Sequence, residues 1–313
     1  MSTTEAEADS RKGLAYALGA YALWGLMPLY VVLMVGINAF ELVGWRVLAS
    51  LLFAALFLWI LGGWRRVGKL FRDKRALLWL SMAGVAILVN WTTFAYAVLT
   101  ERVLDTSLGY FLNPLISIIL AVIVLRERMR PLQWVAAGLM VIAVVVMIVG
   151  YGTVPLIALI LASAFGTYGL LKKQVGSRVD ALAGFTVETA ATLPFAIGML
   201  VVVGATSGLT VIGMPAYVPW LVLGFGFMTA LPLLLFAAAA RRLTLIVLGF
   251  LQYLAPSMSF VFGVFLLGEP MPLERLLGFA IVWLALIVMT ADTVIHGRRS
   301  RKAAKIARVE PTP

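Results

Sequence analysis

Cysteine is absent from the 313-residue sequence, and histidine occurs once, as His296. The chain can therefore form no disulfide, no thiolate metal site and no cysteine nucleophile, and it has no cluster of His and Cys ligands for zinc. It also lacks the glycine-rich loop and lysine of a P-loop, so it is not expected to hydrolyse ATP. No convincing Ser/His/Asp set is present. The sequence predicts no cofactor, no metal and no enzyme active site.

Charge is also scarce, because only 12% of residues are charged and 63% are apolar. An average soluble domain is about 25% charged and about 45–50% apolar. Mean hydropathy is +1.03, which excludes a disordered chain. The net charge of +11 alone would allow a soluble nucleic-acid-binding protein, but the hydropathy does not. The composition instead predicts a multi-pass membrane protein.

Ten mostly apolar stretches are long enough to be helices that cross the bilayer, which takes about 20 residues. They are too long and too unalternating for barrel strands. The fold class expected is therefore all-α integral membrane, with ten transmembrane helices. The predicted spans are 14–34, 39–61, 77–99, 106–125, 132–149, 154–171, 181–203, 217–240, 243–267 and 273–295.

The positions of the basic residues predict the orientation of these spans. With the N-terminus inside, 22 of the 25 Lys and Arg residues fall on the cytoplasmic side, as the positive-inside rule requires. We expect residues 1–12 and the basic tail 297–313 to be cytoplasmic, in a protein of the inner (cytoplasmic) membrane. The tail is then expected to contact anionic lipid rather than nucleic acid. The sequence leaves open whether the protein forms a homodimer.

The two halves of the sequence resemble each other. Leu-Gly-Tyr at 108–110 recurs as Leu-Gly-Phe at 248–250, and Pro114 recurs as Pro256, so corresponding positions keep a nearly constant offset along the chain. This repeat offset predicts a first five-helix repeat over 13–150 and a second over 151–296. An odd number of spans inverts the second repeat, and inverted repeats are frequent in secondary transporters.

Several short motifs add a family resemblance. They are Trp24-Gly25, Asn90-Trp91, the run 107–114, Glu127 and the run 249–253. Together they resemble the RarD subgroup of the EamA-type branch of the drug/metabolite transporter superfamily, over nearly the whole chain. The resemblance implies a carrier of small metabolites, often an exporter. It also implies a central cavity lined by the first, third, fourth, sixth, eighth and ninth helices.

Two charged residues stand out because they lie well inside predicted spans, Arg46 in the second and Glu188 in the seventh. A charge at that depth costs a few kcal/mol, so each needs a compensating partner or a function. The two positions are separated by the same offset as Pro114 and Pro256, and we expect them to approach each other. The alternatives are separate charges near the headgroups and a role in substrate recognition or proton coupling.

Proline residues within spans suggest hinges, above all Pro114 and Pro256. Each removes a backbone hydrogen bond and frees a carbonyl, which must face protein or a water-lined cavity. Kinks needed only for packing are the alternative, and Asn90 could equally make an interhelical hydrogen bond. The candidates for the substrate cavity are Trp24, Asn90, Trp91, Tyr110, Asn113, Tyr168, Gln252 and Tyr253.

The function expected is secondary transport of a small organic metabolite or drug across the cytoplasmic membrane, by alternating access and in the export direction. A proton-coupled drug efflux carrier is the alternative within transport. An intramembrane transferase or a membrane scaffold are the alternatives outside it. A transferase would need paired acids to hold a metal, whereas one central Glu is present.

Overall fold

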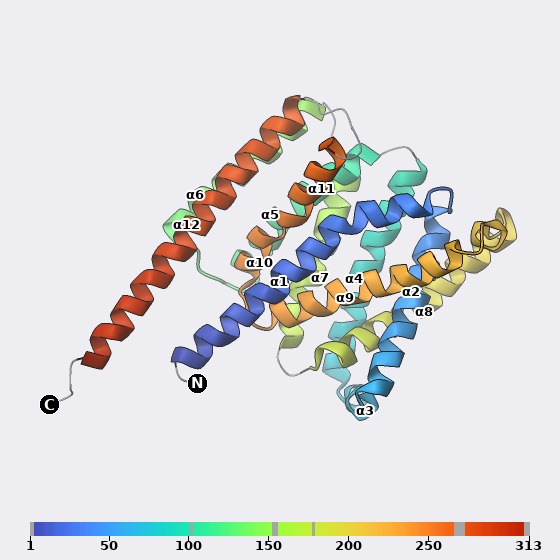
Figure 1. Ribbon diagram of the computed structural model, residues 1–313, viewed down its shortest axis with the longest axis horizontal. Coiled ribbons are helices and arrows are strands. Elements are labelled where there is room, and N and C mark those ends of the chain that lie inside the picture. The colour runs from blue at the N-terminus through green and yellow to red at the C-terminus, as the bar shows by residue number, and fades with distance from the viewer. Residues whose placement is uncertain (1–2, 101–102, 152–155, 177–178, 266–272, 310–313) are drawn as a thin grey trace. The chain divides into compact units, whose positions relative to one another are not determined.

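The computed structural model is built from α-helices joined by short connections (Figure 1). It describes residues 3–100, 103–151, 156–176, 179–265 and 273–309. The helices are α1 (Thr3–Val31), α2 (Ala39–Ile60), α3 (Trp64–Arg72), α4 (Lys74–Leu99), α5 (Val103–Ile123), α6 (Pro131–Tyr151), α7 (Leu156–Val175), α8 (Ala181–Thr206), α9 (Val218–Ala240), α10 (Leu245–Leu251), α11 (Leu254–Phe265) and α12 (Leu273–Val309), with short 3-10 turns η1 (Val32–Met34) and η3 (Thr210–Gly213).

Local sequence explains where α2 and α8 begin. Asn38 caps α2 by accepting hydrogen bonds from two backbone N–H groups, and Asp180 caps α8 in the same way with one. Side-chain oxygens at this position satisfy N–H groups that have no partner within the helix. Gly36 and Gly176 precede these caps and have φ values of +97° and +63°, which L side chains rarely adopt.

Among the residues that the structure describes, seven helices are long and apolar enough to cross a membrane, and three shorter apolar helices lie at 108–123, 245–258 and 276–292. These ten segments overlap the ten predicted spans. The first residue of the sixth predicted span, 154, and the last residue of the ninth, 267, lie outside the described residues. Two details were not predicted. The ninth segment is broken between α10 and α11, at Gln252 and Tyr253, and the amphipathic helix α3 follows α2.

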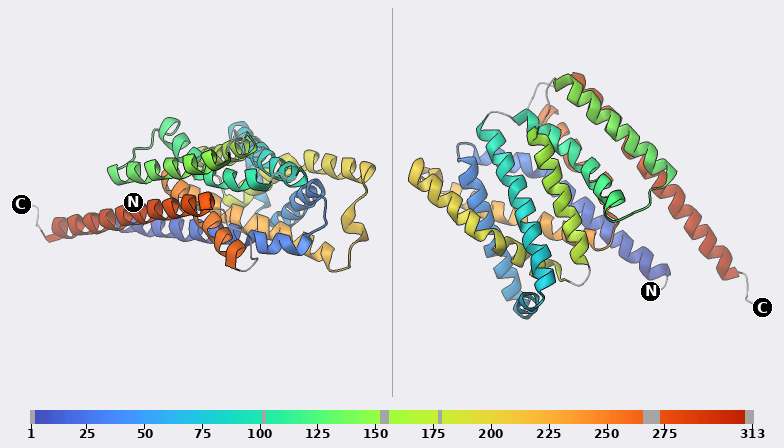
Figure 2. Two further views of the ribbon diagram at one scale, coloured as in Figure 1. Left: turned by 90° about the horizontal axis from the view of Figure 1, so that it is seen from above. Right: turned by 180° about the vertical axis from the view of Figure 1, so that it is seen from behind.

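The chain divides into two compact units. The first comprises residues 1–127 and 155–269, and the second comprises residues 128–154 and 270–313. In the first unit α1 packs on α9 and α11, while α7 packs on α4 and α5. Figure 2 shows α7 between α4 and α5 in the view from behind. Helix α2 packs on α8 and α9, and α8 also contacts α4. The boundaries of the two repeats remain a prediction.

Two glycines allow close approach of α4 to α8 and of α9 to α2. A Cβ on Gly84 of α4 would lie 2.5 Å from the backbone O of Glu188 and 3.2 Å from Thr192 on α8. A Cβ on Gly226 of α9 would lie 2.7 Å from the backbone N of Ser50 on α2. Gly226 follows Gly84 by the repeat offset, and Thr192 follows Ser50 by the same number of positions. The two crossings therefore use corresponding positions.

A second pair of crossings shows the same correspondence. A Cβ on Gly25 of α1 would lie 2.7 Å from Met258 Cβ on α11, and one on Gly166 of α7 would lie 2.8 Å from Ile116 Cγ2 on α5. Met258 follows Ile116 by the repeat offset, and Gly166 follows Gly25 by one position less. Small residues at such contacts are the usual means of close packing between membrane helices.

The second unit consists of α6 packed on α12. A Cβ on Gly278 would lie 2.8 Å from Met147 Cγ, so these helices also approach closely at a glycine. Arg130, just before α6, forms an ion pair with Asp292 of α12 at 3.1 Å. The Asp292 side chain is 8% exposed, so this pair compensates a carboxylate that is removed from water.

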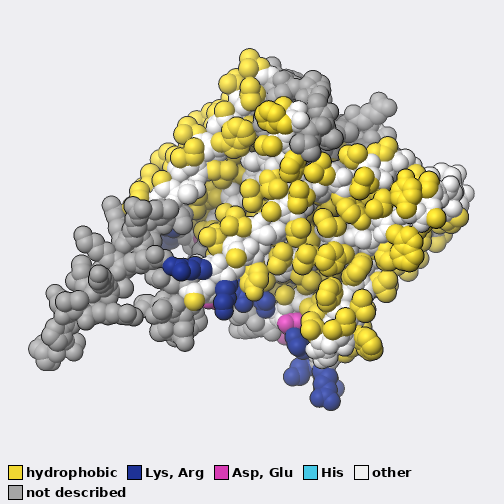
Figure 3. All heavy atoms as spheres, viewed as in Figure 1, with side chains coloured by type: hydrophobic (Ala, Val, Ile, Leu, Met, Phe, Trp, Pro, Cys, Tyr) yellow, Lys and Arg dark blue, Asp and Glu magenta, His cyan; other side chains and the backbone are white. Residues whose placement is uncertain are grey.

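Hydrophobic side chains cover most of the visible surface over α2 and α9 (Figure 3). Lys and Arg side chains gather instead around α3 and the end of α9. An apolar surface of this extent would promote aggregation in water. An apolar band with charges at its edge is instead suited to a bilayer.

Candidate functional site

Arg46 lies on α2, and three side chains on two neighbouring helices surround its guanidinium group. Its Cζ is 4.0 Å from the centre of the Trp91 ring on α4 and 5.0 Å from that of Phe225 on α9. Its Nε donates a 2.8 Å hydrogen bond to Thr229 Oγ1. The Thr229 hydroxyl donates in turn to the Phe225 backbone O, so its lone pairs are free to accept from Arg46. We call this group the Arg46 cluster.

Tyr110 of α5 lies within electrostatic range of Arg46. Its ring is 6.3 Å from that of Phe94 on α4. Tyr110 is 44% exposed, whereas its neighbours Leu108 and Phe111 on α5 are at most 1% exposed. The structure thus places the predicted cavity residue Trp91 against the intramembrane cation, and it packs Tyr110 on Phe94, three residues further along α4.

The expectation that Arg46 and Glu188 approach each other is wrong. Helices α2 and α8 run antiparallel, since Gly44 contacts Leu200 near one end and Leu58 packs with Val187 near the other. Leu58 lies about 12 residues beyond Arg46, which corresponds to about 18 Å along a helix. Equivalent positions on antiparallel helices lie at opposite depths unless they are central, and these two are each the eighth residue of their helix.

Glu188 has its own partners on α7. Lys172 Nζ lies 2.6 Å from Glu188 Oε2, and the Tyr168 hydroxyl donates to Oε1 at 3.0 Å. The side chains of Lys172 and Glu188 are 5% and 2% exposed, so both charges are buried. Lys172 was counted only among the 22 basic residues expected on the cytoplasmic side. Its spacing of four residues from Tyr168, which places both on one helix face, is the signal that could have identified the pairing.

Aromatic rings join α1, α7 and α9 in the first unit. The Trp24 ring centre lies 5.5 Å from Phe165 and 5.9 Å from Phe236, and Tyr168 stacks on Phe236 at 5.7 Å. Tyr21 completes the group at 5.6 Å from Trp24. Trp24 and Tyr168, predicted as separate cavity residues, therefore belong to one aromatic cluster. The Tyr168 hydroxyl links this cluster to Glu188.

Polar side chains gather where α5 meets α10. The Ser117 hydroxyl lies 3.0 Å from the backbone O of Asn113 and 3.4 Å from Gln252 Oε1. Asn113 Oδ1 is buried and accepts no hydrogen bond from the described residues. A buried acceptor without a partner is costly, so this oxygen is suited to a water molecule or a ligand.

The remaining predicted residues make structural contacts. Asn90 Nδ2 donates to the Leu161 backbone O at 2.9 Å, which is the interhelical bond that was the alternative for this residue. The Tyr253 hydroxyl, at the break between α10 and α11, donates to the Phe111 backbone O at 2.9 Å. Pro114 lies inside α5 and Pro256 inside α11, and their role as hinges remains a prediction.

Helix ends that carry basic residues are linked by polar contacts. Glu127 accepts hydrogen bonds from the first two backbone N–H groups of α10, and Lys173 donates to the Leu243 backbone O. Arg242 pairs with Asp9 at 2.9 Å. Arg241 donates to the Val179 backbone O at 3.1 Å. These contacts connect α1, α5, α7 and α9 to the segments that begin α8 and α10.

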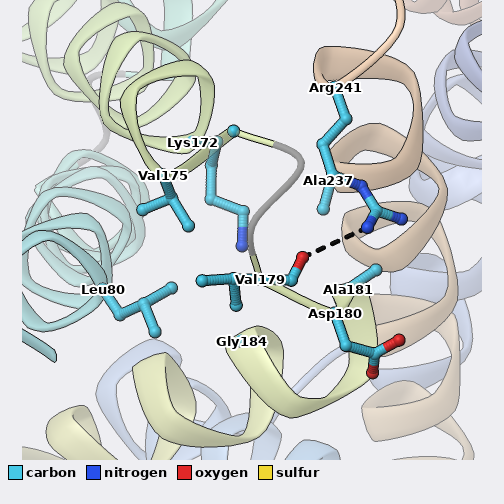
Figure 4. Close-up of a pocket in the computed structure, with 10 residues that line it drawn as sticks. Leu80, Lys172, Val175, Val179, Asp180, Ala181, Gly184, Ala237 and Arg241 are labelled. Atoms are coloured by element: carbon cyan, nitrogen blue, oxygen red, sulfur yellow. Dashed lines mark hydrogen bonds between the residues drawn. The ribbon is translucent and has the colours of Figure 1, made fainter. Parts of the chain in front are cut away.

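A small cavity of about 10 Å³, enough for one water molecule, lies among these contacts (Figure 4). Lys172 and Arg241 are among its lining residues. Burial, followed by the neighbouring charge of Arg242, lowers the pKa of Arg241. A second, larger groove of about 370 Å³ is lined mainly by apolar side chains of α2 and α9, including Trp45 and Trp220. Neither is lined by Arg46.

Comparison with known proteins gives a consistent result. Residues 11–149 match the model of the EamA-like transporter family. Protein RarD of Streptomyces exfoliatus is 41% identical over 98% of this chain and 96% of its own length. An uncharacterized transporter of Vibrio cholerae is 35% identical over 97% of this chain and all of its own, and Protein RarD of Escherichia coli is 36% identical over 94% and 99%.

One solved crystal structure superposes with a TM-score of 0.68 and covers 89% of this chain and 97% of its own. Its sequence is 17% identical, so the likeness concerns the fold alone.

Proposed function

The chain belongs to the EamA-like transporter family, in its RarD subgroup, and from this premise we propose that it is a secondary transporter that exports a small organic solute by alternating access. It is a multi-pass membrane transporter of the drug/metabolite class. The proposal adds ten spans in two inverted repeats, an inner-membrane location and cytoplasmic termini. It also adds a substrate path between the two repeats.

The observation that carries the proposal is the correspondence of helix contacts between the two halves. If each helix is exchanged for its counterpart in the other repeat, the pair α1–α9 becomes α7–α4 and the pair α1–α11 becomes α7–α5, and all of these are observed. The two pairs of glycine crossings follow the same rule. Two halves that pack through equivalent surfaces can rock about a central site, which is the basis of alternating access in inverted-repeat transporters.

The proposed orientation rests on charge. The linked basic helix ends form the side that the positive-inside rule assigns to the cytoplasm. Polar contacts hold that end together, while Tyr110 and the Arg46 cluster lie toward the opposite end of their helices. This arrangement is expected of a conformation closed toward the cytoplasm, with the solute site facing outward.

Proton-coupled efflux is a second candidate, and the buried Glu188 favours it. Ionisable residues within membrane helices frequently relay protons, and Glu188 is held by Lys172 and Tyr168 rather than exposed to lipid. An imposed pH gradient should then drive uptake or efflux in wild-type vesicles and fail to do so in the double variant Glu188→Gln with Lys172→Met, which removes both buried charges. Equal rates with and without the gradient would leave substrate exchange as the mechanism.

Solute counterflow in proteoliposomes tests the proposed function. Vesicles are loaded in turn with organic acids, amino acids and neutral drugs, and exchange against the same labelled compound is followed. We expect at least one compound to exchange faster than in protein-free liposomes, and Trp91→Ala to reduce this rate. Exchange at the protein-free rate throughout the panel would contradict a carrier of small organic solutes.

A further inference from the structure

Arg46 is a cation without a counter-charge among the described residues. The carboxylates of the first unit that the structure describes are engaged elsewhere. Glu41, one turn earlier on α2, accepts from the backbone N–H groups of Thr210 and Val211, from the Thr210 hydroxyl and from Trp45 Nε1. Glu188 is held by Lys172 and lies at a different depth. An uncompensated charge within a membrane is costly, so its retention points to a function.

The contacts of Arg46 leave one edge of its guanidinium group open. Trp91 and Phe225 face the group as π systems, and cation–π contacts leave the in-plane N–H bonds free. Because Nε already donates to Thr229, a bidentate ligand cannot bind the edge formed by Nε and one Nη atom. Nη1 and Nη2 make no hydrogen bond to the described residues, so the end-on edge can donate two parallel hydrogen bonds to one planar anion.

The surroundings of this edge restrict the kind of anion. The rings of Trp91 and Phe225 lie against the guanidinium group, and Tyr110, which packs on Phe94, is 44% exposed. The single positive charge of Arg46 balances a monovalent carboxylate, whereas a phosphate dianion would keep one uncompensated negative charge within the membrane. No described carboxylate adjoins the cluster to bind the ammonium group of a zwitterion.

We propose that the Arg46 cluster is an anion-binding subsite that takes the carboxylate of an organic monoanion with an apolar or aromatic body. This assignment rests on the proposed transport function and names its substrate class. Arg46 holds the carboxylate end-on, Thr229 fixes the guanidinium plane, and Trp91 stacks on its face. The substrate charge then supplies the missing counter-charge at membrane depth.

The absence of native cysteine allows a test that does not require the natural substrate. Tyr110→Cys is reacted with two methanethiosulfonate reagents, one bearing a sulfonate and one a trimethylammonium group. A cation nearby should favour the sulfonate reagent, and adding Arg46→Gln should lower the ratio of the two rates about tenfold, for unit charges separated by several ångströms. Ser207→Cys, on an exposed loop, is the matched control, and its ratio should not change.

Protection experiments separate carboxylate recognition from the electric field alone. Acetate, benzoate and phenylacetate are each compared with the corresponding amide as inhibitors of the sulfonate reaction in the Tyr110→Cys variant. At least one acid should protect the introduced thiol more than its amide does. Arg46→Lys should keep the reagent preference but lose this protection, because an ammonium group cannot form the planar bidentate pair. Arg46→Lys also carries the test if Arg46→Gln does not fold.

The outcomes distinguish the two proposals. If neither reagent reaches the introduced thiol, the solute cavity of the proposed function is contradicted, and the subsite with it. If both reagents react but Arg46→Gln leaves their ratio unchanged, or if no acid protects more than its amide, the carboxylate subsite is overturned while the cavity stands.

Discussion

Removing one partner of the buried pair between Glu188 and Lys172 should destabilise the protein strongly. Glu188→Gln leaves the Lys172 ammonium, 5% exposed, without its carboxylate at 2.6 Å. An unpaired buried charge of this kind costs about 3–5 kcal/mol. Glu188→Gln combined with Lys172→Met removes both charges and should recover most of that loss, because a neutral pair has no desolvated charge to compensate.

The assay is unfolding of purified wild type, both single variants and the double variant in mixed micelles, followed by tryptophan fluorescence. A double-mutant cycle then yields a coupling free energy, expected to be about 2 kcal/mol or more. Arg66→Gln is the matched control, because its ion pair with Asp180 is 54% and 35% exposed and should contribute less than about 1 kcal/mol.

Two results would refute this reasoning. The first is a Glu188→Gln variant whose stability differs from wild type by no more than that of Arg66→Gln. The second is a double variant as unstable as the sum of the two single variants, which would mean that the two charges do not interact.

The helix crossings, the α10 cap and the α10–α11 break give further predictions. Gly84→Ala and Gly226→Ala place a Cβ 2.5 Å from backbone atoms and should each cost about 1–3 kcal/mol in the same unfolding assay. Gly198→Ala, which meets nothing within 4 Å inside a helix, should instead be neutral or stabilising; equal effects would refute the crossing argument. Glu127→Gln weakens the cap on α10, and we expect a loss of about 0.5–2 kcal/mol; unchanged stability would show that the cap is dispensable. Tyr253→Phe removes a buried hydrogen bond from the side chain to the Phe111 backbone O and should cost about 0.5–1.5 kcal/mol, whereas a neutral result would show that this bond contributes nothing to stability.

Much of the helical organisation could be predicted because hydrophobic length is a direct requirement of the bilayer. The break in the ninth segment was indicated only indirectly, by the two extra residues near Gln252 and Tyr253 relative to the first half. The short helix α3 was not predicted because its alternating basic and apolar residues resemble a charged loop when they are counted only for topology.

The candidate site was predictable in its residues but less so in its pairings. Arg46 and Glu188 were identified because charges within apolar spans are conspicuous. Their partners were not identified. The separation of two residues along the sequence shows that they are equivalent in the two repeats, but it does not give their depth in the membrane. Glu188 pairs with Lys172, a residue that composition assigns to a cytoplasmic segment, and Arg46 is stabilised by rings and by Thr229, which carry no charge signal.

Alternating access requires a solute site within the membrane that opens to each side in turn. Asn113 lies midway along α5, and its side-chain oxygen is buried without a described partner. A single cysteine at this position can be probed with a membrane-impermeant thiol reagent in right-side-out and inside-out vesicles. We expect labelling in both preparations, at rates that change in opposite directions when a transported solute is added. Labelling from one side only, or from neither, would contradict alternating access.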